Sequence, residues 1–170
     1  MTGAMESARH LAGRVLGVDL GSVRIGLALS DPTRTVASPH SVLKRSREHA
    51  ADHRAILDLA TEEEATTIVV GLPLSLSGAK GPAAKAAESE IAELQAAAGE
   101  HVTVIAHDER LTTISAERSL DEAGVRGRDR TAVVDKVAAA VMLQSWLESP
   151  GAKKPKGKTP KGKTPKGKTE

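Results

Sequence analysis

The stretch "GVDLGSVRIGLALSD", Gly17 to Asp31, places a carboxylate inside an apolar run. Residues 14–21 and 24–31 are strand-like, and the two residues between these runs predict a β-hairpin. Asp19 lies within the first run. An ionised carboxylate in an apolar environment is costly unless it is paired or holds a metal. The sequence must therefore supply a partner for Asp19, and Arg24 is the nearest basic candidate.

The rest of the chain continues with further strands and helices. Ser46 is placed to cap the first helix, and Pro82 is typical of the first turn of the second helix. Three strands followed by alternating helices and strands indicate an α/β fold with a mixed sheet. The expected strands cover 37–45, 66–72 and 101–109, and the expected helices cover 46–65, a segment from residue 82, 112–124 and 131–148.

Length and charge divide the chain into three parts. At 170 residues it can form one domain with a sizeable core. Residues 153–170 carry eight lysines and one acid, so this segment is basic while the remainder is acidic. We expect a flexible N-terminus over 1–13, one domain over 14–149 and a disordered Lys/Pro/Gly repeat over 150–170. The repeat is either a polyanion-binding tail or a solubilising one.

Several functional classes are excluded by composition and pattern. The absence of cysteine excludes disulfide scaffolds, cysteine nucleophiles and thiolate zinc sites. No secretory signal or membrane-length apolar run is visible, so we expect a cytoplasmic protein without membrane contact. Residues 157–164, "GKTPKGKT", match a phosphate-loop pattern literally. They stand in a proline-spaced repeat rather than between a strand and a helix, so we interpret the match as accidental.

Acids stand at three positions that structural residues seldom occupy. Asp19 lies in the first strand, Asp108 and Glu109 end the last strand, and Asp135 lies near the start of the last helix. Each has an ordinary explanation: a buried basic partner, a strand-end turn, or the helix dipole. Taken together they favour a site for Mg²⁺ or Mn²⁺, which prefer hard oxygen ligands. Gly21 would let a phosphate backbone approach Asp19 closely.

Four segments, in order and spacing, resemble the signature segments of the YqgF family, also called RuvX, of RNase H-like nucleases. They are "GVDLGSVRIGLALSD", "IVVGLPLSLSGAKG", "DERLTT" and "VDKVAAAVMLQSWL". The resemblance implies an RNase H-like α/β fold with a five-stranded mixed sheet in the order 3-2-1-4-5. It also implies Asp19, Glu109 and Asp135 as catalytic and metal-binding acids. Strand alternation allows only one of Asp108 and Glu109 to face the site.

The family's assigned roles imply a nucleic-acid substrate. These roles are processing of the 5′ end of pre-16S ribosomal RNA, which we expect here, and cleavage of Holliday junctions as the alternative. Ribosomal precursor particles are then a possible partner. The only aromatic residue is Trp146, so recognition by backbone and shape is favoured over base stacking. The expected substrate-binding residues are Gly21, Arg24, Lys80, Arg110, Thr112 and Thr113.

Two other functional classes share parts of the pattern. The segment "VDLGSVRIGLAL" also looks like the first phosphate-binding segment of actin-like and sugar-kinase ATPases. Those enzymes hold nucleotide between two such domains, which this length cannot supply. A non-catalytic nucleic-acid module is disfavoured because all three acids are present. One aromatic residue and no long heptad run favour a monomer, whereas a dimer would favour junction resolution.

Overall fold

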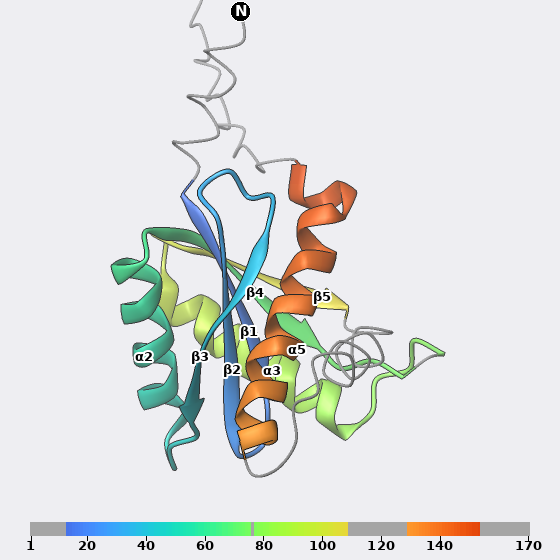
Figure 1. The fold of residues 1–170 in the computed structure, drawn as a ribbon. Helices are drawn as coiled ribbons and strands as arrows, with labels where there is room; N and C mark the ends of the chain where they lie inside the picture. The colour runs from blue at the N-terminus through green and yellow to red at the C-terminus, as the bar shows by residue number, and fades with distance from the viewer. Residues whose placement is uncertain (1–12, 76, 109–128, 154–170) are drawn as a thin grey trace, which may run out of the picture.

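A five-stranded mixed sheet forms the centre of the molecule (Figure 1). The structure is a computed structural model that describes residues 13–75, 77–108 and 129–153. The strand order is β3-β2-β1-β4-β5, which confirms the expected order 3-2-1-4-5. The strands are β1 (Arg14–Leu20), β2 (Arg24–Ser30), β3 (Ala37–Lys44), β4 (Ala65–Leu72) and β5 (Thr103–Asp108).

Strand direction decides which ends of the strands meet. Strand β1 pairs antiparallel with β2, as the hairpin prediction requires, and β2 pairs antiparallel with β3. Strands β4 and β5 run parallel to β1. The carboxyl ends of β1, β4 and β5 therefore lie side by side at one end of the sheet, which we call its carboxyl edge. Open α/β sheets place their ligand sites at this edge.

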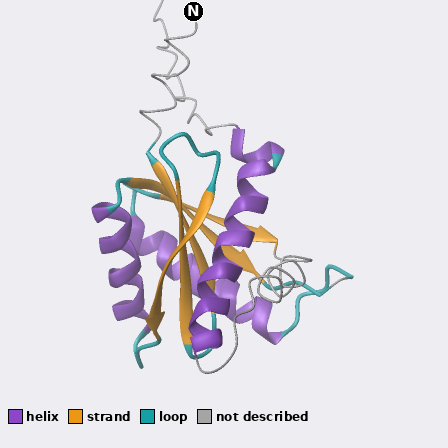
Figure 2. Cartoon of the chain, in the orientation of Figure 1, coloured by secondary structure: helices purple, strands orange, loops and turns teal. Residues whose placement is uncertain are grey.

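Helices cover both faces of the sheet (Figure 2). Helix α5 (Asp129–Glu148) crosses one face, which we call the α5 face. Helices α2 (His49–Glu62) and α3 (Pro82–Ala98) cover the opposite face, which we call the α2–α3 face. The core has two clusters, one on each face. The larger lies on the α2–α3 face and includes Leu16, Val18, Ile25, Leu27, Ile56, Ile68, Ile91 and Leu94.

The α5 face is built from smaller side chains, so the helix approaches the strands closely. A Cβ atom at Gly17 would lie 2.9 Å from the Cβ of Leu143. At Gly26 the contact is closer, because a Cβ atom there would lie 2.1 Å from the carbonyl oxygen of Asp135. These two glycines let the backbone of α5 lie directly over β1 and β2.

The predicted helices that fall within the described residues are present, with one misplaced cap. Helix α3 begins at Pro82 as expected, and its apolar residues Ala84, Ala87, Ile91 and Leu94 are buried. Helix α2 begins later than its expected cap: Glu48 is the N-cap and makes no side-chain capping bond. Ser46 lies two residues earlier, where its Oγ accepts a hydrogen bond from the Glu48 N–H at 3.1 Å. The backbone N–H of Ser46 donates a hydrogen bond to Asp52 Oδ1 at 3.0 Å.

The expected domain boundaries stay predictions. Helix α5 is followed by a short 3-10 helix, η1 (Pro150–Lys153), and Ala152 packs against the core cluster of the α5 face. The described chain thus continues a few residues past the expected boundary at 150. The helix predicted over 112–124 lies outside the described residues. Within the described ranges no helix is long and apolar enough to cross a membrane.

Candidate active site

Asp19 lies where strand β1 leaves the core. Residues 15 to 18 are buried, whereas Asp19 and Leu20 are only half-buried. Side chains alternate along a strand, so Asp19 shares its face with Gly17, which packs against α5. Leu20 packs against the other cluster. The carboxylate therefore belongs to the α5 face, at the edge where the three parallel strands end.

Asp135 is brought to the same place by helix α5. Asp19 is paired in register with Gly26 of β2. The carbonyl of Asp135 lies directly above Gly26, as the glycine contacts show. Opposed residues of an antiparallel pair have Cα atoms about 4.5–5.5 Å apart. The backbone of Asp135 therefore lies on the α5 face, beside the strand position that pairs with Asp19.

Arg24 contacts the second acid. Its Nε donates a hydrogen bond to Asp135 Oδ2 at 2.9 Å, and both side chains are about a third exposed. Arg24 was the nearest candidate to pair with Asp19, and the ion pair that the structure shows joins it to Asp135. The guanidinium thus lies beside Asp135 and is partly exposed to solvent.

The end of β5 separates two neighbouring residues. Ile105 packs against the α5 cluster, and His107 Nε2 lies 3.2 Å from Ser145 Oγ of α5. Val104 packs in the opposite cluster. By alternation Asp108 shares the face of Val104 and points away from the α5 face. Burial lowers the pKa of His107, against the opposing effect of the Asp108 charge.

The turn after Asp19 needs a glycine for a steric reason. The Gly21 N–H donates to the Asp19 carbonyl at 3.1 Å. A Cβ atom at Gly21 would lie 2.4 Å from the carbonyl oxygen of Arg24. The hairpin therefore closes only if position 21 carries no side chain. Its expected contact with a phosphate stays a prediction.

A buried charged cluster beside this turn was missed in the sequence. We call it the Arg45 cluster; it consists of Arg45, Asp52, His53 and Glu90. The Arg45 Nη2 donates to Glu90 Oε2 at 2.9 Å, and Nη1 donates to Glu90 Oε1 and to Asp52 Oδ2. The Nε of the same guanidinium donates to the Gly21 carbonyl at 2.8 Å. The cluster thus joins two helices to the turn that follows Asp19.

The electrostatics of this cluster follow from the single guanidinium between two acids. Burial alone would raise the pKa of Glu90, but the hydrogen bond and charge of Arg45 hold it below its usual range. Burial acts the same way on Asp52, and the Ser46 N–H together with Arg45 lowers its pKa. The hydrogen bond to Glu90 raises the pKa of Arg45 against the effect of burial. All three groups are charged at neutral pH.

The helix patterns held a signal for this cluster. Glu90 stands three residues after Ala87 and four before Leu94, and both of these belong to the apolar stripe of α3. Asp52 and His53 stand four and three residues before Ile56 on the buried face of α2. Charged residues at core positions of amphipathic helices require buried partners. The sequence left the identity of those partners open.

The other expected site residues are not joined to the acids by a described contact. Lys80 precedes α3 and pairs with Glu88, and both side chains are exposed. Glu109, Arg110, Thr112 and Thr113 lie outside the described residues. Within 13–75, 77–108 and 129–153 no three acids or histidines form a group that could hold a metal ion. Two of the three expected acids, Asp19 and Asp135, lie within the described residues, and their role stays a prediction.

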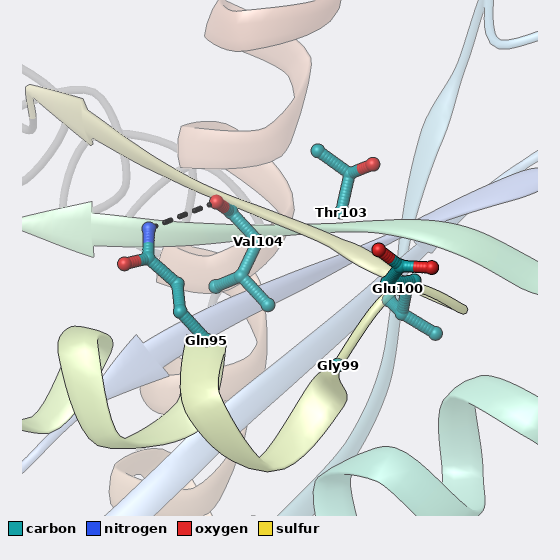
Figure 3. A pocket seen from close by; sticks show the side chains of 6 residues that line it. Gln95, Gly99, Glu100, Thr103 and Val104 are labelled. Carbon is teal, nitrogen blue, oxygen red and sulfur yellow. Dashed lines mark hydrogen bonds between the residues drawn. The ribbon is translucent and has the colours of Figure 1, made fainter. Parts of the chain in front are cut away.

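A small pocket lies elsewhere, at the amino end of β5. It has a volume of about 250 Å³ and is lined by Gln95, Gly99, Glu100, Val102, Thr103 and Val104. Figure 3 shows Gln95 reaching across it, where Nε2 donates to the Val104 carbonyl at 3.1 Å. Strand β5 begins at the sheet edge opposite to its carboxyl end. The pocket is therefore separate from Asp19 and Asp135.

The chain is similar to known proteins over most of its length. Three relatives carry the name "Putative pre-16S rRNA nuclease". The protein of Mycobacterium sp. (strain KMS) is 47% identical over 136 residues, 80% of each chain. That of Mycobacterium leprae (strain Br4923) is 46% identical over 144 residues, 84% of this chain and 77% of the relative. That of Rhodococcus erythropolis (strain PR4 / NBRC 100887) is 43% identical over 139 residues, 80% and 78% of the two chains.

A solved structure and a family model complete the assignment. The structure described as "T. thermophilus RuvC in complex with Holliday junction substrate" matches with a TM-score of 0.50 at 18% identity, over 79% of this chain and 96% of that chain. This likeness confirms the expected RNase H-like fold. The model described as "RuvX: Holliday junction resolvase" matches residues 13–149. The chain therefore belongs to the RuvX family, also called YqgF.

Proposed function

We propose that this protein is a metal-dependent nuclease that processes the 5′ end of pre-16S rRNA. One observation supports the catalytic part: the backbone of Asp135 lies on Gly26, which pairs in register with Asp19 at the carboxyl edge of the sheet. Two acids at the carboxyl edge do not help to stabilise the hydrophobic core, because like charges close to each other repel. The relatives named above support the nuclease class.

Glu109 is proposed as the third acid. It follows Asp108, whose side chain belongs to the opposite face of the sheet. A strand continuing by one residue would turn the next side chain to the face of His107, which contacts α5. This alternation supports Glu109 rather than Asp108 as the partner of Asp19 and Asp135.

The chemistry of these side chains fits Mg²⁺ or Mn²⁺. Asp19, Glu109 and Asp135 would supply hard carboxylate oxygens, which both ions prefer. When bound, such an ion activates a water and stabilises the leaving oxygen in a displacement at phosphorus. The chain's own residues orient the substrate. Arg24, which lies beside Asp135, can contact a phosphate. Lys80, Arg110, Thr112 and Thr113 are proposed as further contacts to the backbone.

Precursor rRNA is the proposed substrate because the relatives at 43–47% identity carry that name. It would place the protein in the cytoplasm, with ribosomal precursor particles as the partner and a monomer as the active form. The second candidate is a branched DNA junction. It is favoured by the description of the family model and by the junction substrate that the structural neighbour holds. A dimer with two sites would suit paired cuts at a junction.

A cleavage assay separates these substrates. Purified protein is incubated with labelled precursor rRNA and with a four-way junction, with and without Mg²⁺ or Mn²⁺. We expect site-specific, ion-dependent cleavage of the RNA, and only uncoupled nicks in the junction. Paired cuts in the junction by a dimer would make junction resolution the better assignment.

Asp19→Asn tests the acid pair, and Asp108→Asn is its matched control. Both changes remove one carboxylate charge from the end of a strand, but Asp108 belongs to the face away from α5. We expect Asp19→Asn to lower single-turnover cleavage by about 1000-fold or more while the fold is retained. Asp108→Asn should cleave at close to the wild-type rate. Equal rates for Asp19→Asn and wild type would contradict the proposal.

A further inference from the structure

The residue that fixes the end of strand β1 is Arg45, which follows β3. Its backbone N–H donates to the Val23 carbonyl at 2.9 Å. Its side-chain Nε donates to the Gly21 carbonyl at 2.8 Å. One residue therefore binds the β1–β2 turn at two carbonyls, one on each side of Ser22. The Gly21 carbonyl belongs to the residue two positions after Asp19.

The guanidinium itself is held on its other side by the acids of the Arg45 cluster. Glu90 of α3 accepts two hydrogen bonds from the Arg45 guanidinium in a fork, and Asp52 of α2 accepts one from it at 3.3 Å. The side chains of Glu90 and Asp52 are about 95% buried, and that of Arg45 is 14% exposed. Planar, bidentate contacts of this kind fix the direction of a guanidinium more strictly than a single ammonium contact can. The turn is thus attached to both helices of the α2–α3 face.

The opposite end of the same strand offers an internal comparison. Arg34 Nε donates to the Gly13 carbonyl at 2.8 Å, just before β1 begins, and its Nη2 donates to Thr66 Oγ1 at 2.9 Å. Each end of β1 is therefore held by an arginine that donates to a glycine carbonyl. Only the end held by Arg45 carries Asp19.

We propose that Arg45 is a positioning residue that sets the place of the Asp19 carboxylate through the Gly21 turn. This inference rests on the nuclease function proposed above. Arg45 and its cluster lie on the α2–α3 side and act through the backbone, not through contact with substrate. Catalytic groups must be held closely in their productive geometry, because a displacement of about 1 Å can lower a rate by about 100-fold.

Arg45→Lys is the deciding variant, because it keeps the positive charge and removes the fork. We expect the single-turnover rate at saturating protein to fall by about 10- to 100-fold, while KM changes by less than about 2-fold. Amide hydrogen exchange over residues 21–23 should become faster. Glu90→Gln should shift both measurements in the same direction by a smaller factor, since the fork is weakened but Arg45 remains.

Arg34→Lys is the matched control at the other end of β1. It should lower the melting temperature by an amount similar to Arg45→Lys, yet leave the cleavage rate within about 2-fold of wild type. The proposal is overturned if both arginine variants lose the same fraction of activity, or if Arg45→Lys keeps wild-type rate and exchange. Loss of the folded state in both Arg45→Lys and Glu90→Gln would also overturn it, by reducing the cluster to a folding requirement.

If the protein is not a nuclease, the same experiments give a different result. Wild-type protein would then cleave neither substrate with either ion, and only the hydrogen-exchange measurement would remain. Faster exchange at residues 21–23 in Arg45→Lys, with no such change there in Arg34→Lys, would still show that Arg45 fixes the turn. Equal exchange in all three proteins would exclude the positioning role independently of activity.

Discussion

The two faces of the sheet are packed in opposite ways. On the α2–α3 face the strands present large, fully buried side chains, among them Leu16, Ile25 and Leu27. On the α5 face they present Gly17, Gly26 and Ala28, and the helix backbone fills the space. Large side chains keep a helix at a distance, whereas glycines bring it into contact. The difference shows that the candidate site depends on the absence of side chains at the glycines of the α5 face. The backbone of Asp135 comes close to β1 and β2 because α5 lies directly on Gly26.

The largest expected effect comes from removing volume on the α2–α3 face. Leu27→Ala leaves a cavity at a fully buried position. We expect the free energy of unfolding to fall by about 2–5 kcal/mol. Denaturant unfolding measures this change. The cleavage rate per folded molecule should stay close to wild type, since Leu27 faces away from the acids. A rate loss that exceeds the unfolded fraction would break the proposed division between the two faces.

Adding volume at the neighbouring residue should be less destabilising but more harmful to activity. Gly26→Ala places a Cβ atom against the Asp135 carbonyl, which must then move. We expect the free energy of unfolding to fall by about 1–3 kcal/mol. The cleavage rate should fall by more than the loss of folded protein explains, because the part of α5 that contains Asp135 is displaced.

Gly17→Ala sharpens this prediction. Its Cβ atom would meet the Leu143 side chain at 2.9 Å, about two turns along α5 from Asp135. We expect a stability loss comparable to that of Gly26→Ala and a smaller loss of activity per folded molecule. The same activity loss in both variants would mean that α5 moves as a rigid body, not locally at Asp135.

The smallest expected effect distinguishes the acids of the two faces by pH. The pKa of Asp52 is lowered in the folded protein, so its charge stabilises the fold above the pKa of the unfolded chain. That contribution is lost as the pH falls toward the folded pKa. Asp52→Asn should therefore lower stability by about 1 kcal/mol at pH 7, with the difference shrinking below about pH 4.

Asp19→Asn is the counterpart on the α5 face. Asp19 is proposed to serve the site rather than the core, so we expect its replacement by asparagine to cause no loss of stability at pH 7. Thermal unfolding of both variants from pH 3 to pH 7 measures the contrast. A destabilised Asp19→Asn protein would show that this acid, too, serves the fold.

The sequence predicted the parts of the molecule that depend on local pattern. The hairpin, the strand β4 and the start of α3 at Pro82 follow from alternation, β-branched residues and proline placement, and all are confirmed. Ser46 misled because it binds the Glu48 N–H before the helix begins, while Glu48 takes the cap position. Because Glu48 makes no side-chain capping bond, the usual preference for a capping side chain could not locate the start of this helix.

The contacts that join distant elements were not predictable in the same way. Arg24 pairs with Asp135 across more than a hundred residues, and Arg45 pairs with Glu90 across 45. Each pairing depends on how a helix docks, which glycine contacts and core packing decide. The sequence pattern places Asp19 at the carboxyl end of a strand, where open α/β sheets gather ligand sites. Only the grouping of the acids and the family resemblance assign Asp135 to the same site, and its role there stays a prediction. The place of Glu109 lies outside the described residues.

Helix α5 runs antiparallel to β1 over the sheet. Its first turns lie beside the β1–β2 turn, whereas Trp146 and Leu147 pack with Val15 near the start of β1 (Figure 1). Gly13 and the 3-10 helix that follows α5 therefore lie at the edge of the sheet farthest from the acids. A fusion partner, an affinity label or a surface linkage attached at either of these points would leave the acidic edge facing outward. Such a protein could be immobilised for binding measurements with its proposed substrate surface exposed.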